Sequence, residues 1–149
     1  MRALIQRVTS GEVIIKEKVV SQIGKGYVIL LGIKEGDSEK EADLLAEKIV
    51  NLRVMSDEND KMNLSIKDVD GEILVISQFT LFADTTAGRR PSFIGAAKPE
   101  LAKYLYEYYI DTLKSLGVKN VQTGEFGAYM TVEIFNDGPV TIMLDTDEF

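Results

Sequence analysis

The sequence predicts an α+β fold in which a β-barrel-like, mostly antiparallel sheet is covered by two helices. Three observations support this prediction. Many short segments are apolar throughout or alternate between apolar and polar residues, which is typical of strands. Only two segments carry apolar residues at helical spacing. Strands and helices do not alternate regularly, which argues against a parallel sheet built from βαβ units.

The N-terminal part of the chain is predicted to form strands and the first helix. Four segments are predicted strands: 2–9, 12–16, 18–23 and the buried, glycine-bounded run 27–33. Ser38 and Glu41 have the spacing of a helix capping box. Apolar residues behind them predict a helix of about four turns; they are Ala42, Leu45, Ala46, Ile49 and Leu52.

The remainder is predicted to contain one helix among further strands. After a polar turn at 57–61, a strand is expected over 72–82 and a loop over 83–97. Pro99 suits the first position of the second helix, and Gly117 suits its C-terminal stop. The apolar side of this helix is Leu101, Leu105, Tyr108, Tyr109 and Leu116. Three final strands are expected at 118–122, 128–135 and 140–144.

Length and composition indicate one domain over residues 1–149. No apolar run approaches the ~20 residues of a membrane span. The first residues lack the features of a signal peptide. Because the chain has no cysteine, no disulfide framework suggests export. We therefore expect a cytoplasmic protein without a membrane partner.

The absence of histidine and cysteine restricts the chemistry. A Ser-His-Asp triad, a Cys-His pair and a zinc site with His or Cys ligands are all excluded. Proton transfer in an enzyme of this composition must use a perturbed carboxylate or lysine, water, or the substrate itself. We expect no cofactor and no metal, with a carboxylate-only Mg²⁺ site left open.

The net charge of -7 argues against a nucleic-acid partner, because phosphate binding depends on Lys and Arg. The charge is nevertheless uneven. Segments 1–35 and 86–120 each carry a net charge of +3, whereas 36–85 carries -7 and 121–149 carries -6. The two basic segments could face a phosphate backbone, although from charge alone a mixed solvated surface is the preferred interpretation.

Two motifs are candidates for the functional site. Ser77-Gln78-Phe79-Thr80 comes late in an apolar strand, where polar side chains often face a pocket; satisfied hydroxyls at a strand end are the simpler interpretation. The second motif runs from Asn136 to Thr141 and has the composition of a hairpin turn. Its Gly138-Pro139 pair is unusual there, because proline removes a ladder donor. This X-Pro bond is a candidate for the cis form.

With these two motifs the sequence resembles the D-aminoacyl-tRNA deacylase family, formerly called D-tyrosyl-tRNA deacylase. The resemblance runs along the whole chain and includes the segments 6–8, 57–65, 88–93 and 123–128. Two residues depart from the expected pattern. Gly11 stands where alanine is expected, and Tyr129 stands where many members carry aspartate, a change at the rim of the pocket.

The resemblance implies a homodimer of barrel-like subunits that hydrolyses D-aminoacyl-tRNA. Gly138-Pro139 would be cis and enter the partner's active site, where its backbone excludes L-amino acids. Glycine mischarged on alanine tRNA would also be a substrate. Ser77 and Gln78 would bind the substrate, while Phe79 and Thr80 would supply backbone donors for the oxyanion. The 2′-hydroxyl of the tRNA would assist catalysis.

Two alternatives to this function remain open at the sequence level. One is an esterase with Thr80 as its nucleophile, which would need a lysine or carboxylate base. The other is a non-catalytic RNA-binding module. The deacylase and the RNA-binding module both have RNA as the expected partner, whereas the esterase does not. No DNA partner is expected.

Overall fold

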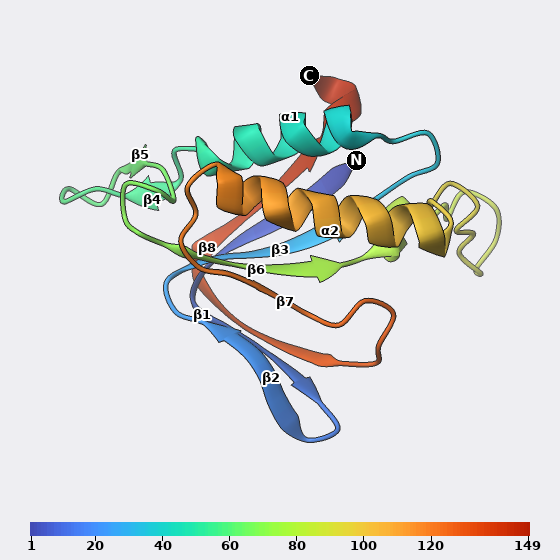
Figure 1. Ribbon diagram of the computed structural model, residues 1–149, viewed down its shortest axis with the longest axis horizontal. Helices are drawn as coiled ribbons and strands as arrows, with labels where there is room; N and C mark the ends of the chain where they lie inside the picture. The colour runs from blue at the N-terminus through green and yellow to red at the C-terminus, as the bar shows by residue number, and fades with distance from the viewer.

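The computed structural model describes residues 1–149 and has a curved sheet with two helices on one face (Figure 1). The strands are β1 Arg2–Ile15, β2 Lys18–Ile23, β3 Gly26–Gly32, β4 Met55–Ser56, β5 Met62–Leu64, β6 Glu72–Ser77, β7 Val121–Thr123 and β8 Thr131–Asp145. The helices are α1 Glu39–Val50 and α2 Pro99–Ser115, and two 3₁₀ turns are η1 Phe79–Phe82 and η2 Thr146–Glu148. The predicted α+β class is confirmed.

The large sheet has the strand order β2-β1-β3-β6-β7, and β8 also pairs with β1. β1 pairs antiparallel with β2, β3 and β8, whereas β3–β6 and β6–β7 are parallel. The hydroxyl of Ser21 in β2 donates to the carbonyl of Thr123 in β7 at 2.7 Å. This bond joins the two ends of the strand order, so the sheet is nearly closed into a barrel.

The prediction of two strands separated by a hairpin turn near the C-terminus is wrong, because both belong to one strand, β8. One strand runs from Thr131 to Asp145, and both of its halves pair with β1. The register shifts between Gln6 and Val8 of β1, opposite the Asn136–Thr141 motif. The motif is therefore an irregularity within one long strand. It stays in the sheet because β1 is long enough to pair with the residues on both sides of it.

The helices follow the predicted start signals. The backbone N–H of Ser38 donates to the Glu41 carboxylate at 2.8 Å, which completes the capping box. Pro99 occupies the first turn of α2, and Gly117 after the helix has a φ of +98°, a conformation that favours glycine. The buried residues of α1 include all four predicted within its bounds, namely Ala42, Leu45, Ala46 and Ile49. In α2, Tyr106 and Ile110 are buried as well as the predicted Leu105 and Tyr109.

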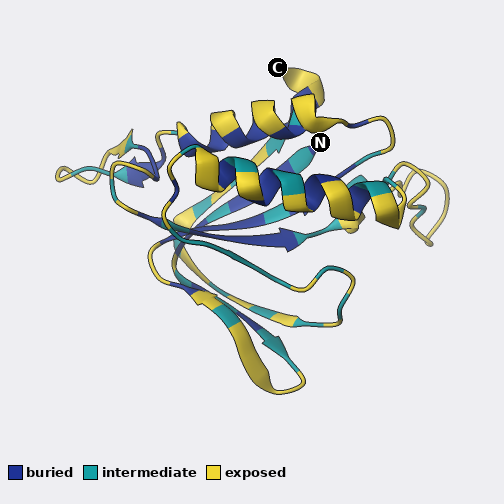
Figure 2. Cartoon of the chain, in the orientation of Figure 1, coloured by how far each residue is buried: buried dark blue, intermediate teal, exposed yellow.

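The main hydrophobic core contains 24 buried residues and lies between the helices and the sheet, where the inner faces are buried (Figure 2). A second cluster lies inside the curve of the sheet; it consists of Val8, Val13, Ile23, Val28, Leu74 and Ile76. Burying two such layers is the main driving force for this arrangement. Neither helix combines the length and the hydropathy that crossing a membrane would require.

The end of β6 differs from the predicted strand over 72–82. Pairing with β3 stops at Ser77, and the next residues form the 3₁₀ turn η1. Within this turn the N–H of Leu81 donates to the carbonyl of Gln78, and the N–H of Ala83 donates to Thr80. The predicted alternation of side chains between the two faces of the strand therefore ends at Ser77. The strand ends here because of a tertiary contact, in which η1 packs on β3 beside Gly32.

Candidate active site

A mostly apolar cavity of about 820 Å³ opens where β6 ends. Its lining comes from segments distant in the sequence: Ile33, residues 76–79, then Phe93, Ala96 and Ala97, then Pro99 and Ala102 of α2, and finally residues 126–130 and Val132. Such concave apolar sites with a few polar groups are typical of small-molecule binding sites. Of the residues predicted for the site, Ser77, Gln78 and Phe79 line this cavity. Thr80 is the next residue and is exposed.

The turn that presents Phe79 and Thr80 depends on a close approach to β3. A Cβ added to Gly32 would lie 3.1 Å from Leu81 Cβ, 3.1 Å from a Phe82 ring carbon and 3.2 Å from the Gln78 carbonyl oxygen. The N–H of Gln78 also donates to the carbonyl of Leu31 at 2.8 Å. Glycine at position 32 therefore allows η1 to sit directly on the strand.

Neither the Phe79 nor the Thr80 backbone amide donates any of the turn and loop hydrogen bonds of the chain. The first hydrogen bond of η1 comes from Leu81, and the first N–H groups of a helical turn have no acceptor within it. The side-chain amide of Gln78 donates to the Thr80 hydroxyl oxygen. No Asp, Glu, Lys or Arg lines the cavity. The site thus offers hydrogen-bond donors and shape, without an ionised side chain for proton transfer.

The loop after η1 is anchored at its base. Asp84 and Ser92 exchange backbone hydrogen bonds of 2.8 and 2.9 Å. The backbone N–H and hydroxyl of Thr86 donate to the Asp84 carboxylate and lower its pKa. Phe93, just beyond this bridge, packs edge-on against Phe79 with ring centroids 5.1 Å apart. The loop is therefore fixed to the cavity while residues 85–91 project from it (Figure 1).

Helix α2, whose residues Pro99 and Ala102 line the cavity, is fixed to β6 by Tyr106. Its hydroxyl donates to the carbonyl of Val75 in β6 at 2.7 Å, and burial raises the pKa of this tyrosine above its usual value. Its ring also packs against Phe126, 5.9 Å away. These contacts join the middle of α2 to β6 and to the segment after β7, which lines the cavity through Phe126.

Gly138 and Pro139 lie away from this cavity in their own subunit. Both are exposed and neither lines it. The motif lies beside Arg7 of β1, which pairs with Tyr27 and through it with Ile73 of β6. Ser77 is four residues further along β6 and three strands away, a separation on the order of 20 Å from strand geometry. The peptide bond between Gly138 and Pro139 is cis, the form for which the sequence made it a candidate.

A buried arginine, Arg7, supports the motif, a role that was not predicted from the sequence. The Arg7 guanidinium donates to the Asp137 carbonyl at 3.1 Å and to the Val54 carbonyl at 2.8 Å. It also forms an ion pair of 3.2 Å with the Asp137 carboxylate. The Asn136 side chain donates to the carbonyls of Arg7 and Val140. The sequence did contain a signal for this role: Arg7 is a charged residue at one of the alternating positions of a strand that face the core.

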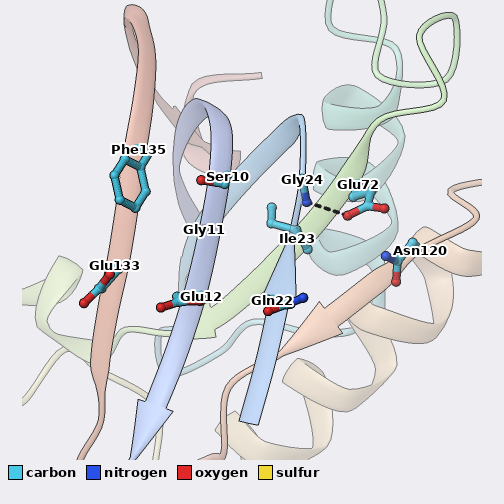
Figure 3. Close-up of a pocket in the computed structure, with 10 residues that line it drawn as sticks. All are labelled: Ser10, Gly11, Glu12, Gln22, Ile23, Gly24, Glu72, Asn120, Glu133 and Phe135. Atoms are coloured by element: carbon cyan, nitrogen blue, oxygen red, sulfur yellow. Dashed lines mark hydrogen bonds between the residues drawn. The ribbon is translucent and has the colours of Figure 1, made fainter. Parts of the chain in front are cut away.

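A second cavity, of about 670 Å³, lies among β1, β2, β6 and β8 (Figure 3). It contains Glu12, Glu72 and Glu133 and no Lys or Arg. Glu12 and Glu133 are direct partners across β1 and β8. Gly11 also lies here, where a Cβ would come within 2.8 Å of a Val28 methyl group. None of the motif residues lines this acidic cavity.

Comparison with known proteins agrees with the motifs. The family model described as D-Tyr-tRNA(Tyr) deacylase matches residues 4–145. The chain is 52% identical over 148 residues to the D-aminoacyl-tRNA deacylase of Clostridioides difficile (strain 630), covering 99% of both chains. It is 55% identical over 146 residues to the D-aminoacyl-tRNA deacylase of Fervidobacterium nodosum, covering 98% of this chain and 97% of the relative.

Solved structures show the same fold. The c-Myc DNA Unwinding Element Binding Protein superposes with a TM-score of 0.92 at 41% identity, over 97% of this chain and 98% of that one. A probable eukaryotic D-amino acid tRNA deacylase superposes with a TM-score of 0.80 over 96% of this chain and 97% of that one. At 16% identity this second likeness shows the fold alone. From the family match and the two full-length relatives, the chain belongs to the D-Tyr-tRNA(Tyr) deacylase family.

Proposed function

We propose that this protein hydrolyses the ester between a D-amino acid, or glycine, and tRNA, and that it rejects L-aminoacyl-tRNA. The observation that carries the proposal is the cavity at the end of β6, which combines backbone donors of η1 with a lining free of ionised side chains. The relatives named D-aminoacyl-tRNA deacylase supply the reaction. Such a substrate places the reaction in the cytoplasm, where tRNA is aminoacylated.

The amides of Phe79 and Thr80 would stabilise the oxyanion that forms when the ester carbonyl is attacked. Preorganised backbone donors in a site that excludes water are an effective form of such stabilisation. Ser77 and Gln78 line the cavity beside them and would hold the substrate. The apolar lining would receive the amino-acid part.

The attack would be assisted by the 2′-hydroxyl of the terminal adenosine of the tRNA. This assignment is supported by the lining of the cavity, which contains no carboxylate, lysine or arginine, and by the lack of histidine and cysteine in the chain. The hydroxyl of Thr80 has Gln78 beside it and no base. A nucleophilic threonine without an activating base is a weak nucleophile.

Chiral selection would come from Gly138-Pro139 of a partner subunit. The motif is exposed and lies on the order of 20 Å from the cavity of its own chain, so only a second copy could bring it there. Its backbone would approach the α-carbon of the substrate, where an L side chain collides and a D side chain points outward. Glycine has no side chain to reject, so glycyl-tRNA mischarged on alanine tRNA would also be cleaved.

The homodimer that this requires has a suitable surface in β8. This strand of 15 residues pairs only with β1, so its other edge is unpaired. Long exposed strand edges are usually covered by another chain or protected. Phe135 and Met143 of β8 are 57% and 48% exposed, which provides apolar area for a partner.

Complementation between two inactive variants tests the shared site. Gly138 has a φ of +147°, and an added Cβ would lie 2.5 Å from the Val140 nitrogen, so Gly138→Ala should displace the motif. Ala96 lines the cavity, so Ala96→Trp should fill it. Each homodimer should be inactive on D-tyrosyl-tRNA. An equimolar mixture that exchanges subunits at random should recover about a quarter of the wild-type activity, because half of its dimers are heterodimers and one of the two sites in each heterodimer is intact.

A lack of activity in heterodimers would contradict the shared site. Two affinity tags, one on each variant, show whether heterodimers have formed. If they have formed and are inactive, each subunit must contain its own complete site. Wild-type activity in the Gly138→Ala homodimer would also remove this motif from the mechanism.

A further inference from the structure

The mouth of the cavity is bordered on two sides by features that the reaction on the terminal aminoacyl-adenosine does not require. On one side is the loop that follows η1, and on the other is the segment between β7 and β8 (Figure 1). Both segments contribute to the same lining, through Phe93 and through Tyr129. They are therefore close enough for one ligand leaving the cavity to contact both.

The loop carries a local positive charge in an acidic protein. Between Asp84 and Glu100 the charged residues are Arg89, Arg90 and Lys98, with no acidic residue among them. Neither Arg89 nor Arg90 forms a salt bridge within the chain, and both are exposed. Arg90 is three residues from Phe93 and hence within about 11 Å of the cavity wall along the chain.

Tyr129 borders the opposite side with its ring in solvent. It is 100% exposed although it belongs to the cavity lining. The next residue, Met130, packs against the second hydrophobic cluster, inside the curve of the sheet. The backbone before β8 is therefore fixed while the Tyr129 ring projects into solvent. An exposed aromatic ring on one side of the cavity mouth and two adjacent arginines on the other have the composition of a single-strand binding surface, in which bases stack and phosphates are neutralised.

We infer that Arg89, Arg90 and Tyr129 bind the single-stranded 3′ end of the tRNA immediately outside the cavity. The two guanidinium groups bind phosphates, and the ring of Tyr129 stacks on a base that precedes the terminal adenosine. The inference rests on the proposed function, since the terminal aminoacyl-adenosine occupies the cavity. Charge complementarity favours this face over the other cavity, whose three glutamates would repel a phosphate backbone.

The test compares two substrates that share the reacting ester. D-tyrosyl-tRNA carries the whole 3′ end, whereas D-tyrosyl-adenosine carries the last nucleoside alone. The double variant Arg89→Ala/Arg90→Ala should raise KM for D-tyrosyl-tRNA by roughly tenfold at low salt. Its kinetics on D-tyrosyl-adenosine should equal those of wild type, because the cavity is unchanged.

Salt dependence provides a second readout. Each phosphate contact on a single strand contributes about -0.7 to the slope of log affinity against log salt. Loss of two contacts should therefore reduce the slope for D-tyrosyl-tRNA by about 1.4. Arg89→Lys/Arg90→Lys should keep most of the slope. Lys114→Ala/Lys119→Ala removes two exposed charges at the other end of α2 and should change neither KM nor the slope.

Tyr129 is tested by a matched pair. Tyr129→Ala should raise KM for D-tyrosyl-tRNA about fivefold or more, the loss expected for one stacked base, and Tyr129→Phe should behave as wild type. The loss for Tyr129→Ala should be at least fivefold larger on D-tyrosyl-tRNA than on D-tyrosyl-adenosine, because only the tRNA carries the base on which the ring stacks.

Two different failures can be told apart. A wild type that cleaves both substrates, combined with arginine and tyrosine variants that match it on tRNA, overturns the RNA contacts and leaves the deacylase intact. A wild type that cleaves neither substrate overturns the proposed function and this inference with it.

Discussion

Thr80 is the residue at which the two catalytic interpretations differ most. It is exposed at the start of η1, and its hydroxyl oxygen accepts a hydrogen bond from Gln78. In the proposed mechanism its backbone contributes and its side chain does not. In an esterase mechanism the hydroxyl would be the attacking atom.

Thr80→Ala should therefore retain most of the activity on D-tyrosyl-tRNA, measured as single-turnover release of the amino acid. The backbone amide that matters is still present in alanine. A loss on the order of 10⁴, together with an acyl-enzyme trapped on the wild type, would restore Thr80 as the nucleophile.

Two buried tyrosines of α2 provide a matched test of packing beneath the site. The hydroxyl of Tyr106 has a partner in Val75, whereas the hydroxyl of Tyr109 is buried with no hydrogen-bond partner. Tyr106→Phe should lower the free energy of unfolding by about 1–2 kcal/mol, because the Val75 carbonyl, which also accepts from the Gly124 N–H, loses the donor that the tyrosine supplies. Tyr109→Phe should cause no loss. Urea denaturation checks both, and equal effects would show that the Tyr106 bond contributes nothing.

At the scale of elements, the junction between β3 and η1 decides where the catalytic amides lie. Gly32→Ala should displace η1, because its Cβ would lie 3.1–3.2 Å from three atoms of the turn and the residue before it. Small displacements of positioning groups lower kcat strongly, here by roughly tenfold or more. Gly95→Ala is the control, since nothing lies within 4 Å of its added Cβ. Equal kcat values for the two variants would mean that the position of η1 is unimportant.

This junction also shows how far local sequence determines structure. The first residues of both helices could be predicted from Ser38 and Pro99, because capping residues act within one turn. The end of β6 could not, since η1 follows from packing against Gly32, far away in the sequence. The two motifs could be found by resemblance, but their separation within one chain depends on β8 continuing through Asn136–Thr141 beside β1. The turn-like residues of that motif gave no indication of this pairing.

At the scale of the whole molecule, the account requires two subunits. Phe135→Lys/Met143→Lys places two charges on the exposed part of β8 and should give a folded monomer without activity on D-tyrosyl-tRNA. Val19→Lys/Val20→Lys is the matched control, because both valines are 52% exposed on β2 and lie outside the proposed interface. Light scattering and circular dichroism separate dissociation from unfolding. An active monomer would contradict the dimeric site.

The reacting group of the substrate is also a property of the whole complex. If the RNA assists its own hydrolysis, tRNA ending in 2′-deoxyadenosine and charged with D-tyrosine should bind normally and be hydrolysed very slowly. Binding is measured by competition with the ribose form, and hydrolysis by release of the amino acid. Equal rates for the two substrates would exclude the 2′-hydroxyl.

The most direct test of the central claim is the rate of release from D-tyrosyl-tRNA and L-tyrosyl-tRNA by the same wild-type preparation, with D-tyrosine ethyl ester as the third substrate. The account predicts rapid release from D-tyrosyl-tRNA alone among these three, because selection acts at the α-carbon and catalysis needs the 2′-hydroxyl of the terminal adenosine, which the ethyl ester lacks. Comparable release from L-tyrosyl-tRNA would contradict chiral selection, and efficient cleavage of the ethyl ester would contradict the requirement for this hydroxyl.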